Sequence, residues 1–180
     1  MSNKSENDLR ESCKLAADFL REKHRNYNDV SGLNRNDRLY SGEREFVAEV
    51  YRLLIERDSC YRDRLLIEAI RPDKGKDSGE AIPDLVYRNG KYEKCVLEVK
   101  APVNKRADGS ELPWKMDRED IKSDYKKLQD NYSQFDKKFL IVAYLGDPIL
   151  ENGKEFPLED FENWVRHEFP NKGNIKVIVC

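Results

Sequence analysis

The sequence predicts a single α/β domain in which helices cover a mixed β-sheet. Segments with apolar residues at helical spacing alternate along the chain with short apolar runs of the kind that form strands. One run, FLIVAYL at residues 139–145, is apolar at nearly every position, as is typical of a strand buried on both faces. A chain of 180 residues is long enough to bury such a core as one domain.

Two helices are expected at the start of the chain. Residues 5–25 have helical spacing and precede a polar linker over residues 26–41. A second helix begins near Ser41, which can cap it, and the acidic Glu43 and Glu45 suit its positive end. The inward positions are Leu9, Cys13, Ala16, Ala17 and Leu20 in the first helix and Phe46, Val47, Val50, Tyr51, Leu54 and Ile55 in the second.

Strands and helices alternate in the rest of the chain. Residues 82–88 and 94–101 are expected to pair around Asn89-Gly90, a dipeptide typical of hairpins. The other expected elements are strands over 64–70, 139–145 and 175–179 and helices over 117–132 and 158–169. Their inward helix positions are Ile121, Tyr125, Leu128, Phe161, Trp164 and Val165. The chain thus divides into a helical extension and linker (1–40), a core (41–146) and a C-terminal helix and strand (147–180).

Composition argues against several classes of protein. Formal net charge is −2, so the chain lacks the strongly basic balance that by itself indicates nucleic-acid binding. No stretch approaches the roughly 20 apolar residues of a membrane span, and the N-terminus lacks the apolar run of a signal peptide. The four cysteines form no CxxC pair, which predicts free thiols in a reducing cytoplasm and no zinc site. His24 and His167 have no partner at ligand spacing.

Two predicted strands carry charges where burial would normally exclude them. In residues 94–101 the side chains alternate, so Glu98 and Lys100 project together from one face. Asp84 follows Pro83 inside the apolar run of the preceding strand. A buried carboxylate is costly unless it is paired or binds a metal. Two carboxylates can hold Mg²⁺ and a lysine can stabilise developing negative charge, a combination that suits phosphodiester hydrolysis.

The acidic residues and the lysine form a short motif, in which thirteen residues separate Pro83-Asp84 from Glu98-Val99-Lys100. This motif resembles the PD-(D/E)xK signature of restriction-endonuclease-like nucleases. The family core, a helix, three strands, a helix and a strand (αβββαβ), is similar to the element order expected here. The resemblance implies a DNA endonuclease that uses Mg²⁺, with Mn²⁺ as a substitute. Asp84 and Glu98 would be metal ligands, with Val99 counted among them, and Lys100 the catalytic lysine. A homodimer would allow both DNA strands to be cut.

The first core helix offers a further acidic residue. Gly42-Glu43-Arg44-Glu45-Phe46-Val47 is similar to the A-E-R-E-L-(I/V) opening of archaeal Holliday-junction resolvases, whose first glutamate serves the site. That match favours Glu43, which also continues the inward stripe of its helix. Glu49 is the second choice and Glu45 the third. The alternative role for Glu43 is an ordinary first-turn acid that complements the helix dipole.

A polar face is expected on the helix after the lysine strand. Lys122, Lys126 and Gln129 lie four and three residues apart, so they share one side of the helix. Proteins of the resembled family often use a polar residue from this helix, so these side chains could meet a phosphate, and the alternative here is a solvated surface. Nearby acidic residues dilute the positive charge, which indicates moderate phosphate binding.

The length of the hairpin loop decides whether the acidic residues meet. A two-residue loop at Asn89-Gly90 would pair Asp84 with Cys95 and place it out of phase with Glu98. An odd loop, such as Arg88-Asn89-Gly90, or a bulge brings Asp84 onto the face of Glu98 and Lys100. Two other readings stay open: a catalytically inert nuclease-fold module that binds nucleic acid or serves as a structural subunit, and an unrelated α/β domain in which Glu98 and Lys100 form an ordinary ion pair.

Overall fold

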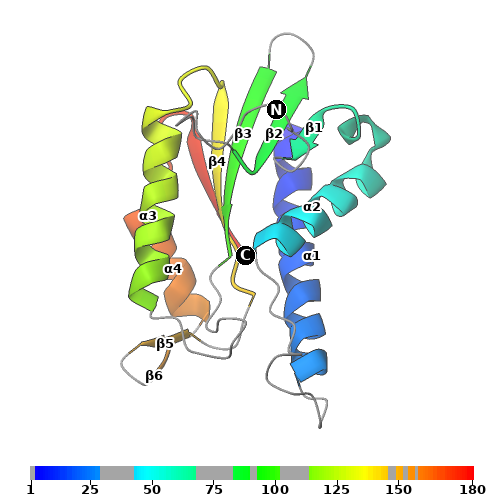
Figure 1. Ribbon diagram of the computed structural model, residues 1–180. Coiled ribbons are helices and arrows are strands. Elements are labelled where there is room, and N and C mark those ends of the chain that lie inside the picture. The colour runs from blue at the N-terminus through cyan, green and yellow to red at the C-terminus, as the bar shows by residue number, and fades with distance from the viewer. Residues whose placement is uncertain are drawn as a thin grey trace, which may run out of the picture.

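The computed structural model describes residues 3–28, 43–67, 83–89, 93–101, 114–145, 149–151, 154–156 and 158–180. Within these residues the chain forms a mixed β-sheet with helices on both faces (Figure 1). The predicted α/β class is therefore confirmed. Most of the expected linker, the loop after β1 and residues 102–113 lie outside the described residues.

The sheet contains five strands in the order β1-β2-β3-β4-β7. Their bounds are β1 Leu65–Ile67, β2 Leu85–Asn89, β3 Glu93–Lys100, β4 Lys137–Val142 and β7 Ile175–Val179. β1, β2 and β3 pair antiparallel, whereas β3, β4 and β7 pair parallel. β5 Ile149–Glu151 and β6 Lys154–Phe156 form a separate antiparallel pair that the sequence analysis did not expect.

The pairing of β2 with β3 has the register that the acidic residues require. Leu85 lies opposite Leu97 and Tyr87 opposite Cys95, so paired residue numbers have an even sum. Three residues, 90–92, separate the last pair, Asn89 and Glu93. The expected odd loop length is confirmed, but the loop begins two residues later than the Arg88-Asn89-Gly90 solution. The next position beyond Leu85, Asp84, is consequently in phase with Glu98.

α1 (Asn3–Asn28) and α2 (Glu43–Arg57) pack on one face of the sheet (Figure 1). All five inward residues predicted for α1 are fully buried, as are Phe46 and Leu54 of α2. They pack against the odd-numbered residues of β3, Cys95, Leu97 and Val99, because side chains alternate along a strand. α1 extends to Asn28, two residues beyond the start of the predicted linker. A short 3₁₀ turn, Ser59–Tyr61, follows α2.

α3 (Trp114–Asp130) and α4 (Leu158–Glu168) cover the opposite face. Ile121, Tyr125 and Leu128 are buried as predicted, and so are Phe161 and Val165, whereas Trp164 is partly buried. β4 ends at Val142, but residues 143–145 remain buried after the strand ends. β1 begins at Leu65, one residue later than predicted, and residues 68–70 of the predicted strand lie outside the described residues. Within the described ranges, no helix is long and apolar enough to cross a membrane.

α1 is an integral part of the core, and a pair of leucines on this helix tests this. Leu20 is fully buried, whereas Leu15 has 47% of its surface exposed. We expect Leu20→Ala to lower the free energy of unfolding by about 2–5 kcal/mol, because it leaves a cavity. Leu15→Ala should change it by about 0.5 kcal/mol or less. Urea denaturation compares the two variants, and equal losses would contradict the assigned orientation of α1.

Candidate functional site

Asp84, Glu98 and Lys100 come together where β2 begins and β3 ends. Asp84 immediately precedes β2, and Lys100 is the last residue of β3. Glu98 lies on the face of β3 that is covered by α3, on the same side as Val96. The register described above puts Asp84 on this face too. The residues that the sequence predicted as a site therefore share one face and one end of the sheet.

Asp84 is tied to the neighbouring strand through its side chain. Its Oδ2 atom accepts a hydrogen bond of 2.6 Å from the main-chain N–H of Val99. Burial raises the pKa of Asp84 to about 7, the hydrogen bond from Val99 opposes the rise, and the negative charges of Glu43 and Asp124 add to it. The Val99 side chain lies in the core with α1 and α2, so the contact that Val99 makes here is a main-chain hydrogen bond to a candidate ligand.

Glu98 is the most buried acid of the site, with 3% of its surface exposed. Its Oε1 atom accepts a hydrogen bond of 2.5 Å from the hydroxyl of Tyr132. Burial raises the pKa of Glu98 to about 8, and the negative charges of Asp84 and Asp124 contribute to the rise against the hydrogen bond from Tyr132. The negative charge of Asp84 thus acts on Glu98, as expected for two carboxyls that lie opposite one another on neighbouring strands.

Lys100 joins both helical layers of the molecule. Its Nζ atom lies 3.0 Å from Oε2 of Glu43 on α2 and 3.2 Å from Oδ2 of Asp124 on α3. Burial lowers the pKa of Lys100, but the two carboxylates outweigh this effect and hold the pKa above its usual range. Lys100 is therefore a cation at neutral pH.

The structure separates the three glutamates of α2. Glu43 contacts Lys100, whereas Glu45 pairs with Lys23 of α1. Glu49 accepts a hydrogen bond of 2.9 Å from Nε of Arg52 one turn along its own helix. The helix position closest to the site is thus the one that the sequence similarity favoured. Its contact with Lys100 distinguishes Glu43 from an acid that serves the helix dipole alone.

Two residues of the site were missed by the sequence analysis. Asp124 on α3 is 4% exposed, and its carboxylate contacts Lys100 through Oδ2 and Lys127 through Oδ1, the latter at 2.6 Å. Tyr132, just after α3, orients Glu98. The sequence did contain a signal for Asp124, because this acid lies within the inward stripe of its helix, three residues after Ile121 and four before Leu128. A buried acid at such a position requires a partner.

The three residues expected to form a polar face on α3, Lys122, Lys126 and Gln129, are all exposed. Lys122 pairs with Glu119 at 3.6 Å on its own helix. Lys126 lines a shallow depression on α3. Neither Lys122 nor Gln129 has a contact with the candidate site among the interactions of the described residues.

The acidic residues could hold a hard cation through two carboxylates. In the part of the chain that the structure describes, no group of three or more His, Cys, Asp or Glu side chains is arranged to hold a metal ion. Mg²⁺ commonly uses one or two protein carboxylates and keeps several waters, so a preformed three-residue cage is not required. Asp84 and Glu98, one partly buried and the other buried, both have raised pKa values and have the chemistry of such a ligand pair, because a cation would offset their repulsion.

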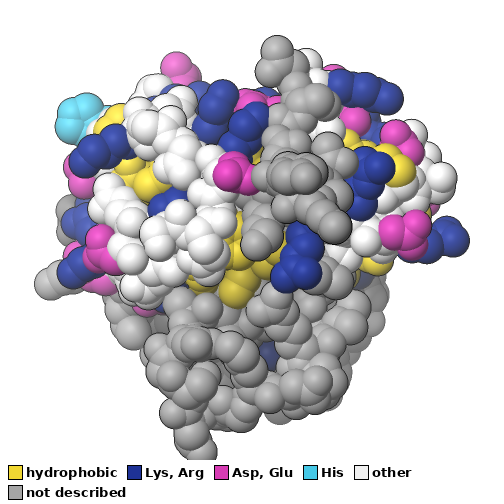
Figure 2. All heavy atoms as spheres, turned by 90° about the horizontal axis from the view of Figure 1, so that it is seen from above, with side chains coloured by type: hydrophobic (Ala, Val, Ile, Leu, Met, Phe, Trp, Pro, Cys, Tyr) yellow, Lys and Arg dark blue, Asp and Glu magenta, His cyan; other side chains and the backbone are white. Residues whose placement is uncertain are grey.

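The other chemistry-bearing side chains lie elsewhere. The four cysteines are free, as predicted, with Cys13, Cys95 and Cys180 buried. His167 is exposed on α4. The side chains of His24 and Trp114 lie outside what the structure describes. Figure 2, viewed from the end at which β3, β4 and β7 begin, shows acidic and basic side chains interspersed, in keeping with a net charge of −2.

Comparisons with known proteins identify no relative of this chain. No protein-family model, no curated protein and no solved structure matches it. The function of the chain must consequently be inferred from the site itself and from the short motif that it contains.

The raised pKa values predict how the metal-free protein responds to pH. Asp84 and Glu98 have native pKa values of about 7 and 8 against ordinary values of 3.8 and 4.5. At pH values between the ordinary and the native pKa, the native state binds more protons than the unfolded state. The pair therefore stabilises the fold at low pH and loses that contribution as pH rises from about 4 to 8.

We expect the stability of Asp84→Asn, relative to wild type, to improve steadily over the same range. The measurement is urea denaturation in EDTA at a series of pH values. A difference between the two proteins that does not change with pH would contradict the raised pKa of Asp84.

Proposed function

We propose that this protein hydrolyses phosphodiester bonds of nucleic acid with Mg²⁺ as its cofactor. The observation that carries the proposal is the pair of carboxyls, the partly buried Asp84 and the buried Glu98, next to the cationic Lys100 at one end of the sheet. DNA as the substrate, endonucleolytic cleavage in the cytoplasm and a homodimer that cuts both strands are parts of the same proposal. They follow from the resemblance to PD-(D/E)xK nucleases.

The order of elements supports a restriction-endonuclease-like core. α2, β1, β2, β3, α3 and β4 follow one another as helix, three strands, helix and strand, and their four strands are adjacent in a mixed sheet. Asp84 stands at the start of the second of these strands, and Glu98 and Lys100 stand on the third. In this assignment α1, α4 and β7 are additions that extend the two helical layers and the sheet.

The charge balance of the site supports a divalent cation. Glu43, Asp84, Glu98 and Asp124 oppose two ammonium groups, Lys100 and Lys127. If all six groups ionise, two negative charges remain, and they lie where burial makes them costly. Asp84 and Glu98 would hold Mg²⁺, which supplies a bound water of lowered pKa and neutralises phosphate charge. The main-chain carbonyl of Val99 is the group through which that residue could take part.

Lys100 would act on the reacting phosphate. Glu43 and Asp124 hold its ammonium group from two sides, so its position is defined before substrate binds. A fixed cation beside a scissile phosphate stabilises the negative charge that develops on the phosphate oxygens. The Tyr132 hydroxyl fixes the orientation of Glu98 in the same way that outer hydrogen bonds orient metal ligands.

The alternative function is an inert nuclease-fold module that binds nucleic acid or has a structural role. Two observations favour it: the described residues contain no ready-made metal group, and Lys100 is already neutralised by two carboxylates. In that case the site would be a buried ion-pair network that joins α2 and α3 to β3. The same network would then stabilise the fold and bind no metal.

Asp84→Asn should separate these functions. The neutral amide lacks the anionic oxygen that Mg²⁺ needs. We expect wild type to melt at a higher temperature in Mg²⁺ or Mn²⁺, and to cut plasmid, linear or branched DNA. Asp84→Asn should lose both effects and be no less stable than wild type in EDTA, because it relieves repulsion. A wild type that gains no stability from either metal and cuts no nucleic acid would support the inert module.

Lys100→Ala should affect rate rather than metal binding. The substitution removes a cation that acts on the transition state, so we expect cleavage to slow by about 10²–10⁴-fold while the Mg²⁺-dependent rise in melting temperature remains. Calorimetric metal titration and cleavage kinetics measure the two effects separately. As a matched control, Lys14→Ala removes an exposed lysine on α1 and should leave both unchanged. Cleavage by Lys100→Ala at the wild-type rate would contradict the assigned role.

A further inference from the structure

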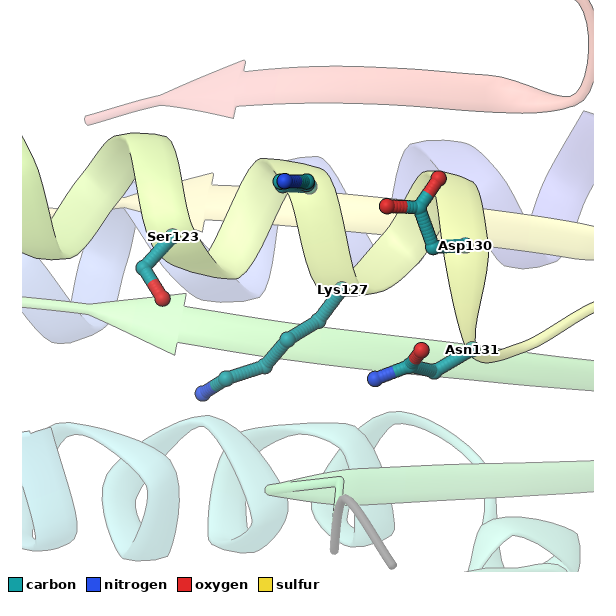
Figure 3. Close-up of a pocket in the computed structure, with 5 residues that line it drawn as sticks. Ser123, Lys127, Asp130 and Asn131 are labelled. Atoms are coloured by element: carbon teal, nitrogen blue, oxygen red, sulfur yellow. The ribbon is translucent and has the colours of Figure 1, made fainter.

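A shallow polar depression lies on α3 beside the candidate site. It is lined by Ser123, Lys126, Lys127, Asp130 and Asn131 (Figure 3). Ser123, Lys127 and Asn131 follow one another at intervals of four residues, so they form a row along one side of the helix. In Figure 3 the side chain of Lys127 extends away from the helix axis toward β3, and Asn131 projects on the same side.

Lys127 is connected to the catalytic residues through Asp124. One oxygen of this nearly buried carboxylate contacts Lys127 at 2.6 Å, and the other contacts Lys100 at 3.2 Å. A single acid thus sets the positions of two ammonium groups, one at the site and one at the edge of the depression. The positive charge of Lys127 also acts on Glu98 and opposes the rise of its pKa. The depression and the candidate site are therefore neighbours that are joined through Asp124.

We infer that the row Ser123-Lys127-Asn131 binds a backbone phosphate of the nucleic-acid strand, next to the phosphate that is cut. This inference rests on the proposed function and names a part of the substrate that the site would hold. Lys127 supplies charge, while the Ser123 hydroxyl and the Asn131 amide supply hydrogen-bond donors, the groups that contact phosphate oxygens in nucleic-acid complexes.

The chemistry of the row favours the sugar–phosphate backbone over the bases. Its members are short polar or cationic side chains, and the residues lining the depression include no aromatic ring that could stack on a base. Asp130 on its rim reduces the net positive charge, so binding should be of moderate strength. Recognition of this kind does not depend on base sequence and weakens as salt rises.

The test measures binding in the absence of cleavage. Full-length protein with Asp84→Asn is titrated in EDTA, at several salt concentrations, against a short fluorescein-labelled oligothymidylate. On this background Lys127→Gln removes the charge, and the double substitution Ser123→Ala with Asn131→Ala removes two donors but keeps the Asp124–Lys127 pair. Lys14→Gln on α1 is the control for loss of an exposed charge, and thermal melts confirm that each variant folds.

We expect Lys127→Gln to weaken binding about tenfold and to reduce the slope of log affinity against log salt by about 0.7, the loss of one phosphate contact. The double variant should weaken binding roughly threefold to tenfold with little change in slope. Lys14→Gln should bind like its parent. Wild-type-like binding by Lys127→Gln, or no binding of the oligonucleotide by the parent, would overturn the inference.

Lys122→Gln provides a second comparison on the same helix. Lys122 lies outside the depression, so an equal loss with Lys122→Gln and Lys127→Gln would assign the binding to the general charge of α3 and overturn the row. The two proposals also fail separately. If binding depends on Lys127 but the wild type cuts no nucleic acid, phosphate binding by the row is supported and the nuclease activity is rejected. If the wild type cuts nucleic acid but binding does not depend on Lys127, phosphate binding by the row is rejected and the nuclease activity is retained.

Discussion

The register between β2 and β3 is the constraint on which the candidate site depends. Side chains alternate along a strand, so a shift of one residue would turn Asp84 to the opposite face of the sheet from Glu98. The hydrogen bond from the Val99 N–H to the Asp84 carboxylate continues this pairing just before the start of β2. α3 packs on β3 and β4 over the face that carries Glu98, so the register also decides that Asp84 lies under the same helical layer.

Two carboxyls lie together on a sheet face that is covered by a helix, and the surrounding residues offset their negative charge only in part. Burial holds the pKa values of Asp84 and Glu98 near neutrality, and Tyr132 and Val99 each supply one hydrogen bond. Lys100 brings a positive charge, but Glu43 and Asp124 neutralise it. The remaining negative charge gives a physical reason to propose a divalent cation, and it equally explains why the metal-free protein should prefer protonated acids.

α3 links the chemistry of the site to the proposed strand-binding surface. Its inward stripe packs on the sheet through Ile121, Tyr125 and Leu128, and Asp124 lies between this stripe and the polar depression. Asp124 can therefore hold Lys100 on one side and Lys127 on the other. A helix placed by core packing thus sets the distance between the two ammonium groups, so a loss of packing under α3 would disturb both together.

The sequence by itself determined the elements and the three motif residues. Helical periodicity identified the buried stripes of α1, α2 and α3, and strand alternation placed Glu98 and Lys100 on one face, because these patterns depend only on local geometry. The predicted helix ends were displaced by a few residues, and the short β5–β6 pair was not predicted, because the local sequence signals for both are weak. The tertiary structure alone selected the three-residue spacing at 90–92, paired Glu43 with Lys100, and brought Asp124 and Tyr132 to the site. Those contacts join residues far apart in the chain, and only packing decides which of many acids and tyrosines will meet.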